Sequence, residues 1–436
     1  MTSLKVKPLL LAAGTKRFNP ENMKVNIDRL EYIFKRRIDV VMPAKSIRMT
    51  TDGKMYFDIP QKLFSVGGTT FTDFKDAETE SDKLRDEGEV DDYKVHIISG
   101  SERQLSLTRT AKQQLLERVD IPVRVANRQA AENRGDLVWR FVGDAIARSN
   151  QSVLVRVLDN EVRSVLSSKY RAIDSLELLK QTTNSIKAAG ADILEIRVWE
   201  DKFQLTAVNP NLKYTIQELL GDNPRYGGIS LPDNAVSAML EIDNDEAGGG
   251  GLNLLLGMYT YLCTNYMLMR RPVLSIKHSG SNLVGSALES LVLSPNTRLL
   301  QARADISKMN DAVSSAFSAE RFNKMMEAAR AAANDVIPDD KKSEAVKAAM
   351  YTSKIPKSEF DAIYESLIAD RDLSRYGLIQ AVTRIPDSGR AANVADLCDR
   401  AGGDLLQLQT ADWERWIDVN AKSYDNGAET EEAVLL

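Results

Sequence analysis

The part of the sequence that most constrains the fold is the stretch 153–209, in which strand-like and helix-like patterns follow one another without a break. Residues 153–158 and 162–173 are rich in β-branched and aliphatic side chains. Asp159 and Asn160 lie between the two runs and are typical turn residues. This pattern predicts a pair of adjacent β-strands.

A helix and a second pair of strands are predicted directly afterwards. Asp174 is a suitable N-cap, Glu177 three positions later completes a capping-box pattern, and Gly190 supplies a helix end. Residues 193–199 and 202–208 then alternate between apolar and polar side chains with the period of a strand. The whole stretch therefore predicts one compact ββαββ unit, a sheet with a helix covering one face.

Shorter patterns extend the prediction on both sides of this unit. Asp52 and Gly53 predict a tight β-hairpin turn, and residues 107–121 and 133–148 have the apolar spacing of helices. The apolar run that begins at residue 252 is interpreted as a buried helix, with a strand following at 273–278.

The chain as a whole is predicted to be an α+β protein, with an antiparallel or mixed sheet and covering helices in the centre and a helical C-terminal region. Residues 72–93 are strongly acidic and poor in apolar side chains, which predicts a loop. The predicted parts are a basic mixed α/β segment (1–70), an acidic loop or insertion (71–94), a central α+β domain (95–290), a helical region (291–422) and a disordered tail (423–436).

The residues available for chemistry exclude several classes of site. The chain has two histidines, His96 and His278, and two cysteines, Cys263 and Cys398, so a histidine triad, a thiolate zinc site and a disulfide framework are not expected. We therefore predict a protein that is not an enzyme, with no cofactor and no metal. No run of about 18 apolar residues occurs, and we expect a cytoplasmic protein with no membrane partner.

Positive charge is clustered although the formal net charge is -5. Residues 1–50 hold eleven Lys and Arg against four Asp and Glu, and further cations gather in the predicted strands. A local basic surface is enough to attract phosphate, and single-stranded nucleic acid is commonly bound by cations together with aromatic side chains. The candidate nucleic-acid-binding residues are Arg156, Arg163, Lys169, Tyr170, Arg171, Arg270, Arg271, Lys277 and His278.

The alternation of side chains along a strand leaves two arrangements open for this cluster. Lys169 and Arg171 share one face and Tyr170 takes the other, so either the cations contact phosphate while Tyr170 is in the core, or the reverse. A third interpretation is that these are edge-strand charges that keep a sheet soluble.

Several phrases resemble the phage- and plasmid-encoded family of unknown function DUF932. They are LSLTRTAKQQLLERVDIPVRV, SVLVRVLDNEVRSVLSSKYRAIDSLELL, YLCTN with a following KHSG, and SRYGLIQAVTR, and together they span about residues 95–410. The family has no established activity, but its members commonly lie beside genes of DNA replication, recombination and host-defence evasion. The resemblance therefore implies a role in DNA metabolism in a bacterial host cell. The strand and helix layout is also similar to that of phage single-strand annealing proteins.

Two functions are predicted from these observations. The first is a non-enzymatic protein that binds or anneals single-stranded nucleic acid as a homo-oligomer. The alternative is a protein-interaction factor, either a host-defence inhibitor or a structural phage component, with a host or phage protein as its partner. Its docking surfaces would be the acidic segment 72–93 and the Ala- and Met-rich helices at 300–335.

Overall fold

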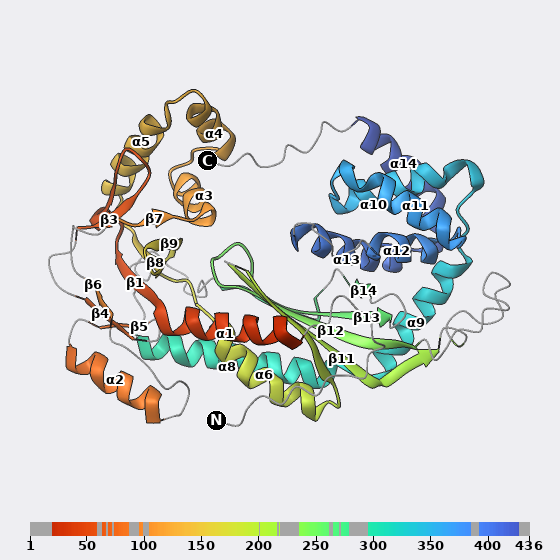
Figure 1. Ribbon diagram of the computed structural model, residues 1–436, viewed down its shortest axis with the longest axis horizontal. Helices are drawn as coiled ribbons and strands as arrows, with labels where there is room; N and C mark the ends of the chain where they lie inside the picture. The colour runs from red at the N-terminus through yellow and green to blue at the C-terminus, as the bar shows by residue number, and fades with distance from the viewer. Residues whose placement is uncertain are drawn as a thin grey trace.

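The ribbon of the computed structural model curves into an open C, with a helical arm at each end and a twisted sheet between them (Figure 1). Antiparallel and mixed sheets occupy the first two thirds of the chain and helices follow, so the predicted α+β class is confirmed. The structure describes residues 20–58, 63–66, 69–71, 74–86, 96–98, 104–199, 201–215, 218, 235–260, 265–269, 272–278, 295–384 and 392–426.

The first arm is built around a four-stranded sheet, here called the N-terminal sheet. Its elements are α1 (Pro20–Arg36), β1 (Arg37–Pro43), η1 (Ala44–Ser46), β2 (Ile47–Met49), β3 (Met55–Phe57), β7 (Ser106–Leu107), α3 (Arg109–Arg118), α4 (Val123–Ala131), α5 (Gly135–Ala147), β8 (Ser152–Leu158) and β9 (Glu161–Ser167). The strand order is β1-β8-β9-β7, and α3, α4 and α5 pack on one face through residues such as Leu115, Val142 and Val155. This face has continuous apolar packing because alternate residues of β1, β8 and β9 are aliphatic.

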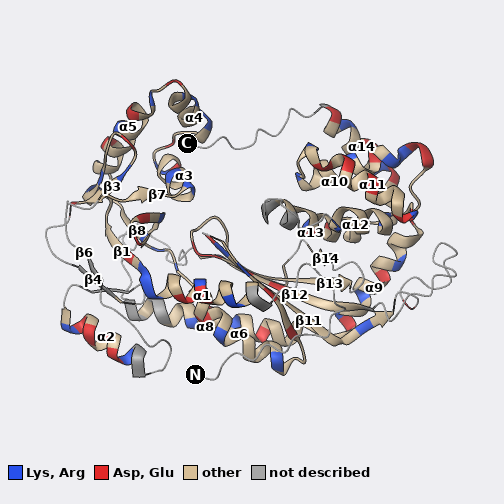
Figure 2. Ribbon diagram, in the orientation of Figure 1, with Lys and Arg blue, Asp and Glu red and all other residues tan. Residues whose placement is uncertain are grey.

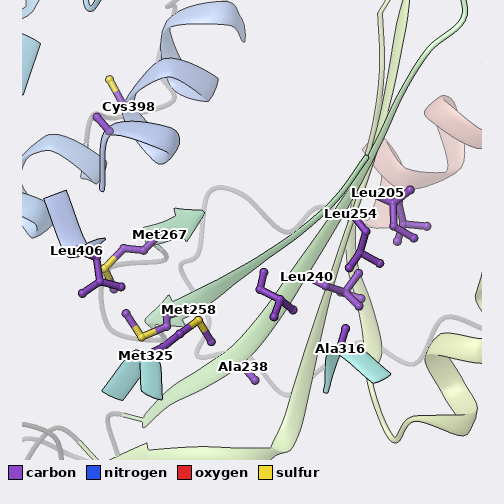
Figure 3. Packing of buried hydrophobic residues seen from close by; sticks show 14 of the residues in the cluster. Leu205, Ala238, Leu240, Leu254, Met258, Met267, Ala316, Met325, Cys398 and Leu406 are labelled. Atoms are coloured by element: carbon purple, nitrogen blue, oxygen red, sulfur yellow. The ribbon is translucent and has the colours of Figure 1, made fainter. Parts of the chain in front are cut away.

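A larger antiparallel sheet, here called the central sheet, forms the base of the C (Figure 1). Its strands are β10 (Asp192–Val198), β11 (Lys202–Thr215), β12 (Ala235–Asp245), β13 (Leu252–Thr260), β14 (Asn265–Leu268) and β15 (Leu274–Ile276), in the order β10-β11-β12-β13-β14 with β15 also paired to β13. Figure 3 shows Leu205, Leu240 and Leu254 from three neighbouring strands in one cluster. Helices α6 (Ser175–Ala188) and α8 (Pro295–Ala316) contribute to the same core.

The second arm consists of helices, as predicted. They are α9 (Ala319–Asn334), η3 (Asp339–Lys341), α10 (Lys342–Ser353), η4 (Lys357–Glu359), α11 (Phe360–Asp370), α12 (Arg375–Thr383), α13 (Ala392–Gln407), η5 (Thr410–Asp412) and α14 (Trp413–Asn426). Ser318 separates α8 from α9 because its side chain caps α9 by accepting a hydrogen bond from the Arg321 N–H. The disordered tail was predicted to begin at residue 423, but α14 continues to Asn426. The rest of that predicted tail lies outside the described residues.

The predicted ββαββ stretch forms its local elements but not one sheet. The pair β8–β9 belongs to the N-terminal sheet, whereas β10–β11 belongs to the central sheet. Each pair is completed by a strand from outside the stretch: Val155 of β8 lies opposite Val40 of β1, and Leu205 of β11 lies opposite Ile242 of β12. The prediction of a single layer is therefore wrong, because the partner strands β1 and β12 lie outside the stretch. The N-terminal sheet also joins the predicted segment 1–70 to the predicted central domain.

Two other segments differ from the prediction. The apolar run from residue 252 forms strands β13 and β14 instead of a helix. A short continuous apolar run suits a strand buried on both faces as well as a buried helix, and eight of the nine residues of β13 are buried. The acidic segment, predicted as a loop, contains helix α2 (Phe74–Asp86), whose buried Ala77 faces a small sheet of β4 (Leu63–Val66), β5 (Thr69–Phe71) and β6 (His96–Ile98).

The predicted helix and turn signals are confirmed where they depend on local chemistry. The Asp174 carboxylate accepts hydrogen bonds from the N–H groups of Leu176 and Glu177 at 2.9 and 3.0 Å, and so caps α6. Gly190 after α6 has a φ of +74°, the left-handed conformation expected of a C-terminal glycine. The hairpin β2–β3 turns at Gly53, where an added Cβ would meet the Trp139 ring at 2.6 Å.

Candidate nucleic-acid interface

Two of the cations predicted to bind nucleic acid, Arg156 and Arg163, lie where the N-terminal sheet meets the central sheet. Arg156 of β8 alternates with Val155 and Val157, so it lies on the face of the N-terminal sheet that α3, α4 and α5 do not cover. Only 2% of Arg156 and 6% of Arg163 is exposed. Both guanidinium groups therefore lie inside the folded protein and do not form part of its outer surface.

These two arginines belong to a set of buried ion pairs. Arg156 Nε donates to Asp39 Oδ1 at 2.9 Å, and Arg163 Nη1 lies 3.5 Å from Glu246 Oε2. Arg37 pairs with Asp174, and its Nε lies 3.8 Å from Asp39 Oδ2. We call this set the buried ion cluster, and its members are Arg37, Asp39, Arg156, Arg163, Asp174 and Glu246.

The buried ion cluster joins elements that are far apart in the sequence. Its residues come from β1, β8, β9, the N-cap of α6 and the turn between β12 and β13. Glu246 in that turn also accepts a hydrogen bond from the Ser175 N–H at 2.8 Å. The Gln114 side chain of α3 donates to the Ala247 carbonyl and accepts from the Val165 N–H. The cluster and its neighbours are thus the seam between the two sheets.

A β-bulge explains how Arg163 reaches this seam. Arg156 lies opposite Ser164, but Val157 lies opposite Val162, so Arg163 is the extra residue of a bulge in the ladder. Regular alternation would direct Arg163 to the opposite face from Ser164. The bulge instead turns the Arg163 side chain toward Glu246, on the same side as Arg156.

Electrostatics favour the charged forms of Glu246 and Arg156 within the cluster. Burial raises the pKa of Glu246, but the charges of Arg156, Arg163 and Arg37 outweigh burial and lower this pKa to about 2. Burial lowers the pKa of Arg156, and the carboxylates of Asp39 and Glu246 reverse that effect, so its pKa is raised. Three cations face three carboxylates, and this balance is the form in which buried charges are tolerated.

Tyr170 and His278 form the next layer of the seam. Tyr170 is 8% exposed, donates its hydroxyl to the Asp245 carbonyl at 2.9 Å, and lies against the His278 ring with centroids 5.1 Å apart. Burial raises the pKa of Tyr170 and lowers the pKa of His278, so both side chains stay neutral near neutral pH. Of the two arrangements left open by strand alternation, the structure has Tyr170 in the core.

The exposed part of the predicted cluster lies outside this layer. The Arg171 N–H donates to the His278 carbonyl at 2.8 Å, and the Arg171 guanidinium donates to the Lys277 carbonyl at 3.1 Å. Arg171 also pairs with Asp305 of α8 at 3.1 Å, and Lys308 pairs with the same carboxylate at 2.8 Å. Four cations therefore gather on this surface, which we call the junction patch: Lys169, Arg171, Lys277 and Lys308.

The junction patch reaches solvent mainly through Lys277 and Lys308. Lys277 is exposed, Lys169 and Arg171 are half-buried, and 61% of the Lys308 side chain is exposed. Within the described part of the chain neither Lys169 nor Lys277 forms an ion pair. Figure 2 shows further blue segments on the neighbouring α6 and α8. Arg270 and Arg271 were predicted to extend this surface and lie outside the described residues.

Asp39 and Glu246 of the buried ion cluster were not singled out from the sequence, and Asp174 was predicted only as the N-cap of a helix. Asp39 carried a usable signal, because a charged residue within the apolar strand RIDVVMP needs a buried partner of opposite sign. Glu246 follows a strand and precedes a glycine-rich turn, where an acidic residue is ordinary. Lys308 was also missed, since its membership depends on α8 lying beside Arg171.

Among the described residues, no group of three or more His, Cys, Asp or Glu side chains is arranged to hold a metal ion. His278 uses Nδ1 on the Arg171 carbonyl at 2.9 Å, and its sequence neighbour Ser279 lies outside the described residues. None of the helices that the structure describes combines the length and apolar character needed to cross a membrane.

Comparison with known proteins gave no match to a family model, to a curated protein or to a solved structure.

Proposed function

We propose that the chain is a non-enzymatic protein of phage or plasmid DNA metabolism, related to the DUF932 family, that binds single-stranded nucleic acid in the cytoplasm of a bacterial cell. The observation that carries the proposal is the junction patch. Lys169 and Arg171 follow β9, Lys277 follows β15, and more than a hundred residues separate them in the sequence. A hydrogen bond from the Arg171 N–H to the His278 carbonyl and the contact of His278 Nδ1 with the Arg171 carbonyl hold the two segments together, with Lys277 exposed and Lys169 half-buried.

The chemistry of the patch favours contacts to phosphate over contacts to bases. Lysine ammonium groups act as point charges toward phosphate, and Arg171 and Lys308 share a single carboxylate, Asp305. Tyr170, the tyrosine of the predicted cluster, is buried against His278 and cannot stack on a base. Binding through the sugar–phosphate backbone is independent of base sequence and weakens as salt rises.

The test is the salt dependence of binding to a labelled single-stranded oligonucleotide, followed by fluorescence anisotropy. A Lys169→Ala, Lys277→Ala, Lys308→Ala triple variant removes three candidate phosphate contacts. Each lost contact lowers the slope of log affinity against log salt by about 0.7 for a single strand, so the slope falls by about 2. Affinity at low salt falls in the same variant.

A matched control is Lys324→Ala in α9. Lys324 is exposed and pairs with a carboxylate one helical turn away, as Lys308 does, but lies on another element. Its replacement leaves both affinity and slope unchanged. Absence of binding by the wild-type protein at about 50 mM salt would contradict the proposal. A triple variant whose log affinity falls with log salt at the wild-type slope would contradict it as well. A duplex of the same sequence, measured in parallel, reports strand preference.

A protein-interaction role is the second candidate, and helix α2 is the observation that favours it. Asp76, Glu78 and Asp82 are exposed on this helix, so a basic partner surface could contact them. The Ala- and Met-rich helices offered as a second docking surface do not support it, because Met309 and Met326 are in the core. Capture of a host protein that survives nuclease and is lost when the three carboxylates are replaced by Ser would support this candidate. Capture that nuclease abolishes would count against it.

A further inference from the structure

The outer face of α5 carries an apolar row in contact with solvent. Leu137 and Phe141 are four residues apart, so they lie side by side on the helix. Leu137 is 53% exposed and Phe141 is 56% exposed, whereas Val138, Val142 and Ile146 on the opposite face are buried. Figure 1 shows α5 at the outer edge of the first arm, away from the central sheet. This row is accessible to another molecule.

A charged row runs beside the apolar one. Asp136, Arg140, Asp144 and Arg148 follow one another at intervals of four with alternating sign, and Arg140, Asp144 and Arg148 are exposed. Arg140 lies 3.6 Å from Asp136 within the helix. Neither Asp144 nor Arg148 has an ion-pair partner in the part of the chain that the structure describes. Figure 2 shows both acidic and basic positions along α5.

The order of the charges makes this row complementary to the same row on a second α5 helix that runs in the opposite direction. In an antiparallel pair centred on position 142, Asp136 faces Arg148 of the second helix and Arg140 faces Asp144. Each of these contacts occurs twice, as required in an interface with a two-fold axis. A parallel pair would place identical charges opposite one another, which is unfavourable.

The apolar row is compatible with the same antiparallel pair centred on position 142. The two Phe141 side chains are then displaced by only about 3 Å along the helix axes, at a rise of about 1.5 Å per residue. Leu137 lies opposite Ala147 of the second helix, an exposed small residue that permits close approach. We propose that the chain forms a homodimer in which the outer faces of two α5 helices pack antiparallel about a two-fold axis near position 142.

This surface is distinct from the junction patch, and the proposal does not depend on nucleic-acid binding. Two of the four charges in the row are carboxylates, which repel phosphate and suit a second copy of the chain. One helix on each side is a small interface, so dissociation in the micromolar range is expected.

Sedimentation equilibrium of the full chain, from about 1 to 100 µM, tests the proposal. The wild type forms a dimer in this range, and a Leu137→Glu, Phe141→Glu variant dissociates at least about 30-fold more readily, as loss of a central aromatic contact implies. Leu300→Glu in α8 is the matched control, because Leu300 is 57% exposed on a different element. It leaves the dimer unchanged. A monomeric wild type, or equal dissociation of the Leu137→Glu, Phe141→Glu variant, overturns the proposal.

A mixing experiment separates the interface from any effect on folding. Arg140→Asp and Asp144→Arg each place like charges opposite one another in a homodimer, so each variant alone is monomeric. In an equimolar mixture, positions 140 and 144 are both acidic in the first variant and both basic in the second. Both cross-helix contacts then join opposite charges, and a heterodimer forms with about the wild-type affinity. Failure of the mixture to dimerise, with both variants folded by circular dichroism, contradicts the antiparallel arrangement.

Discussion

The replacement Glu246→Gln removes one charge from the buried ion cluster and keeps the size of the side chain. In the wild type, Oε2 faces Arg163 at 3.5 Å and Oε1 accepts the Ser175 N–H at 2.8 Å. The glutamine carbonyl can still accept from Ser175, so the change isolates the charge. It leaves three buried cations with two carboxylates, and an unpaired buried cation is strongly destabilising.

The size of the effect follows from the pKa of Glu246. This pKa is 4.5 for an unperturbed glutamate and about 2 in the folded chain, and each unit corresponds to about 1.4 kcal/mol. The charged form therefore contributes about 3 kcal/mol to the free energy of unfolding. Removal of one partner from a buried ion pair independently costs about 3–5 kcal/mol.

The same shift fixes the dependence on pH. The pKa is lower in the folded chain than in the unfolded chain, so the stabilisation is fully present above pH 4.5 and is lost as the pH falls toward about 2. Urea unfolding followed by circular dichroism measures the difference between wild type and Glu246→Gln. We expect about 3 kcal/mol near pH 7 and a difference that narrows steadily below pH 4.5.

The control is Glu320→Gln, since Glu320 is exposed and pairs with Lys324 on the surface of α9. A change of at most about 0.5 kcal/mol is expected there. Equal stability of wild type and Glu246→Gln near neutral pH would refute the reasoning. A difference that stays constant through the acid range would also refute it, because the cost would then not arise from the carboxylate charge.

Three further predictions concern the seam between the two sheets. Tyr170→Phe loses the hydrogen bond to the Asp245 carbonyl and lowers the free energy of unfolding by about 1 kcal/mol, while oligonucleotide affinity stays unchanged. Gly248→Ala lowers the thermal unfolding midpoint by the equivalent of about 1–3 kcal/mol, because φ is +92° and the new Cβ would meet Leu166 at 2.3 Å. Burial lowers the pKa of His278 from 6.5. The contribution of the neutral His278 ring to the free energy of unfolding is therefore fully present above pH 6.5 and is lost as the pH falls below it. His278→Gln therefore reduces the loss of urea stability as the pH falls below 6.5, and an unchanged pH dependence would contradict the assignment.

Features that depend on a few neighbouring residues could be predicted from the sequence. The α6 cap at Asp174, the helix end at Gly190 and the hairpin turn at Gly53 each follow from the chemistry of one to four positions. The helical second arm followed from apolar spacing over long segments. The helix predicted from residue 252 was wrong, because a continuous apolar segment has no period that distinguishes a strand from a helix.

The candidate site could not be predicted from one stretch of the sequence, because its residues contact partners that lie far away in the chain. Arg156 and Arg163 look like surface cations until Glu246, 90 and 83 residues later, comes to lie beside them. The bulge at Arg163 also breaks the alternation from which its direction would be inferred. Conversely, Lys169, Arg171 and Lys277 were identified from the sequence, but their proximity follows from the main-chain hydrogen bond between Arg171 and His278 and from the contact of the His278 ring with the Arg171 carbonyl. Binding of nucleic acid by these residues stays a prediction.

The position of Glu246 in the chain has a consequence for synthesis on the ribosome. Glu246 follows Arg163 by 83 residues, and at about 5–20 residues per second it is added about 4–17 s later. In that interval Arg156 and Arg163 lack the Glu246 carboxylate that both face in the folded chain. The uncovered face of the N-terminal sheet must stay hydrated until the hairpin of β12 and β13 arrives. The arm that is made first therefore completes its packing late, and a nascent chain stalled before residue 246 should remain open to protease.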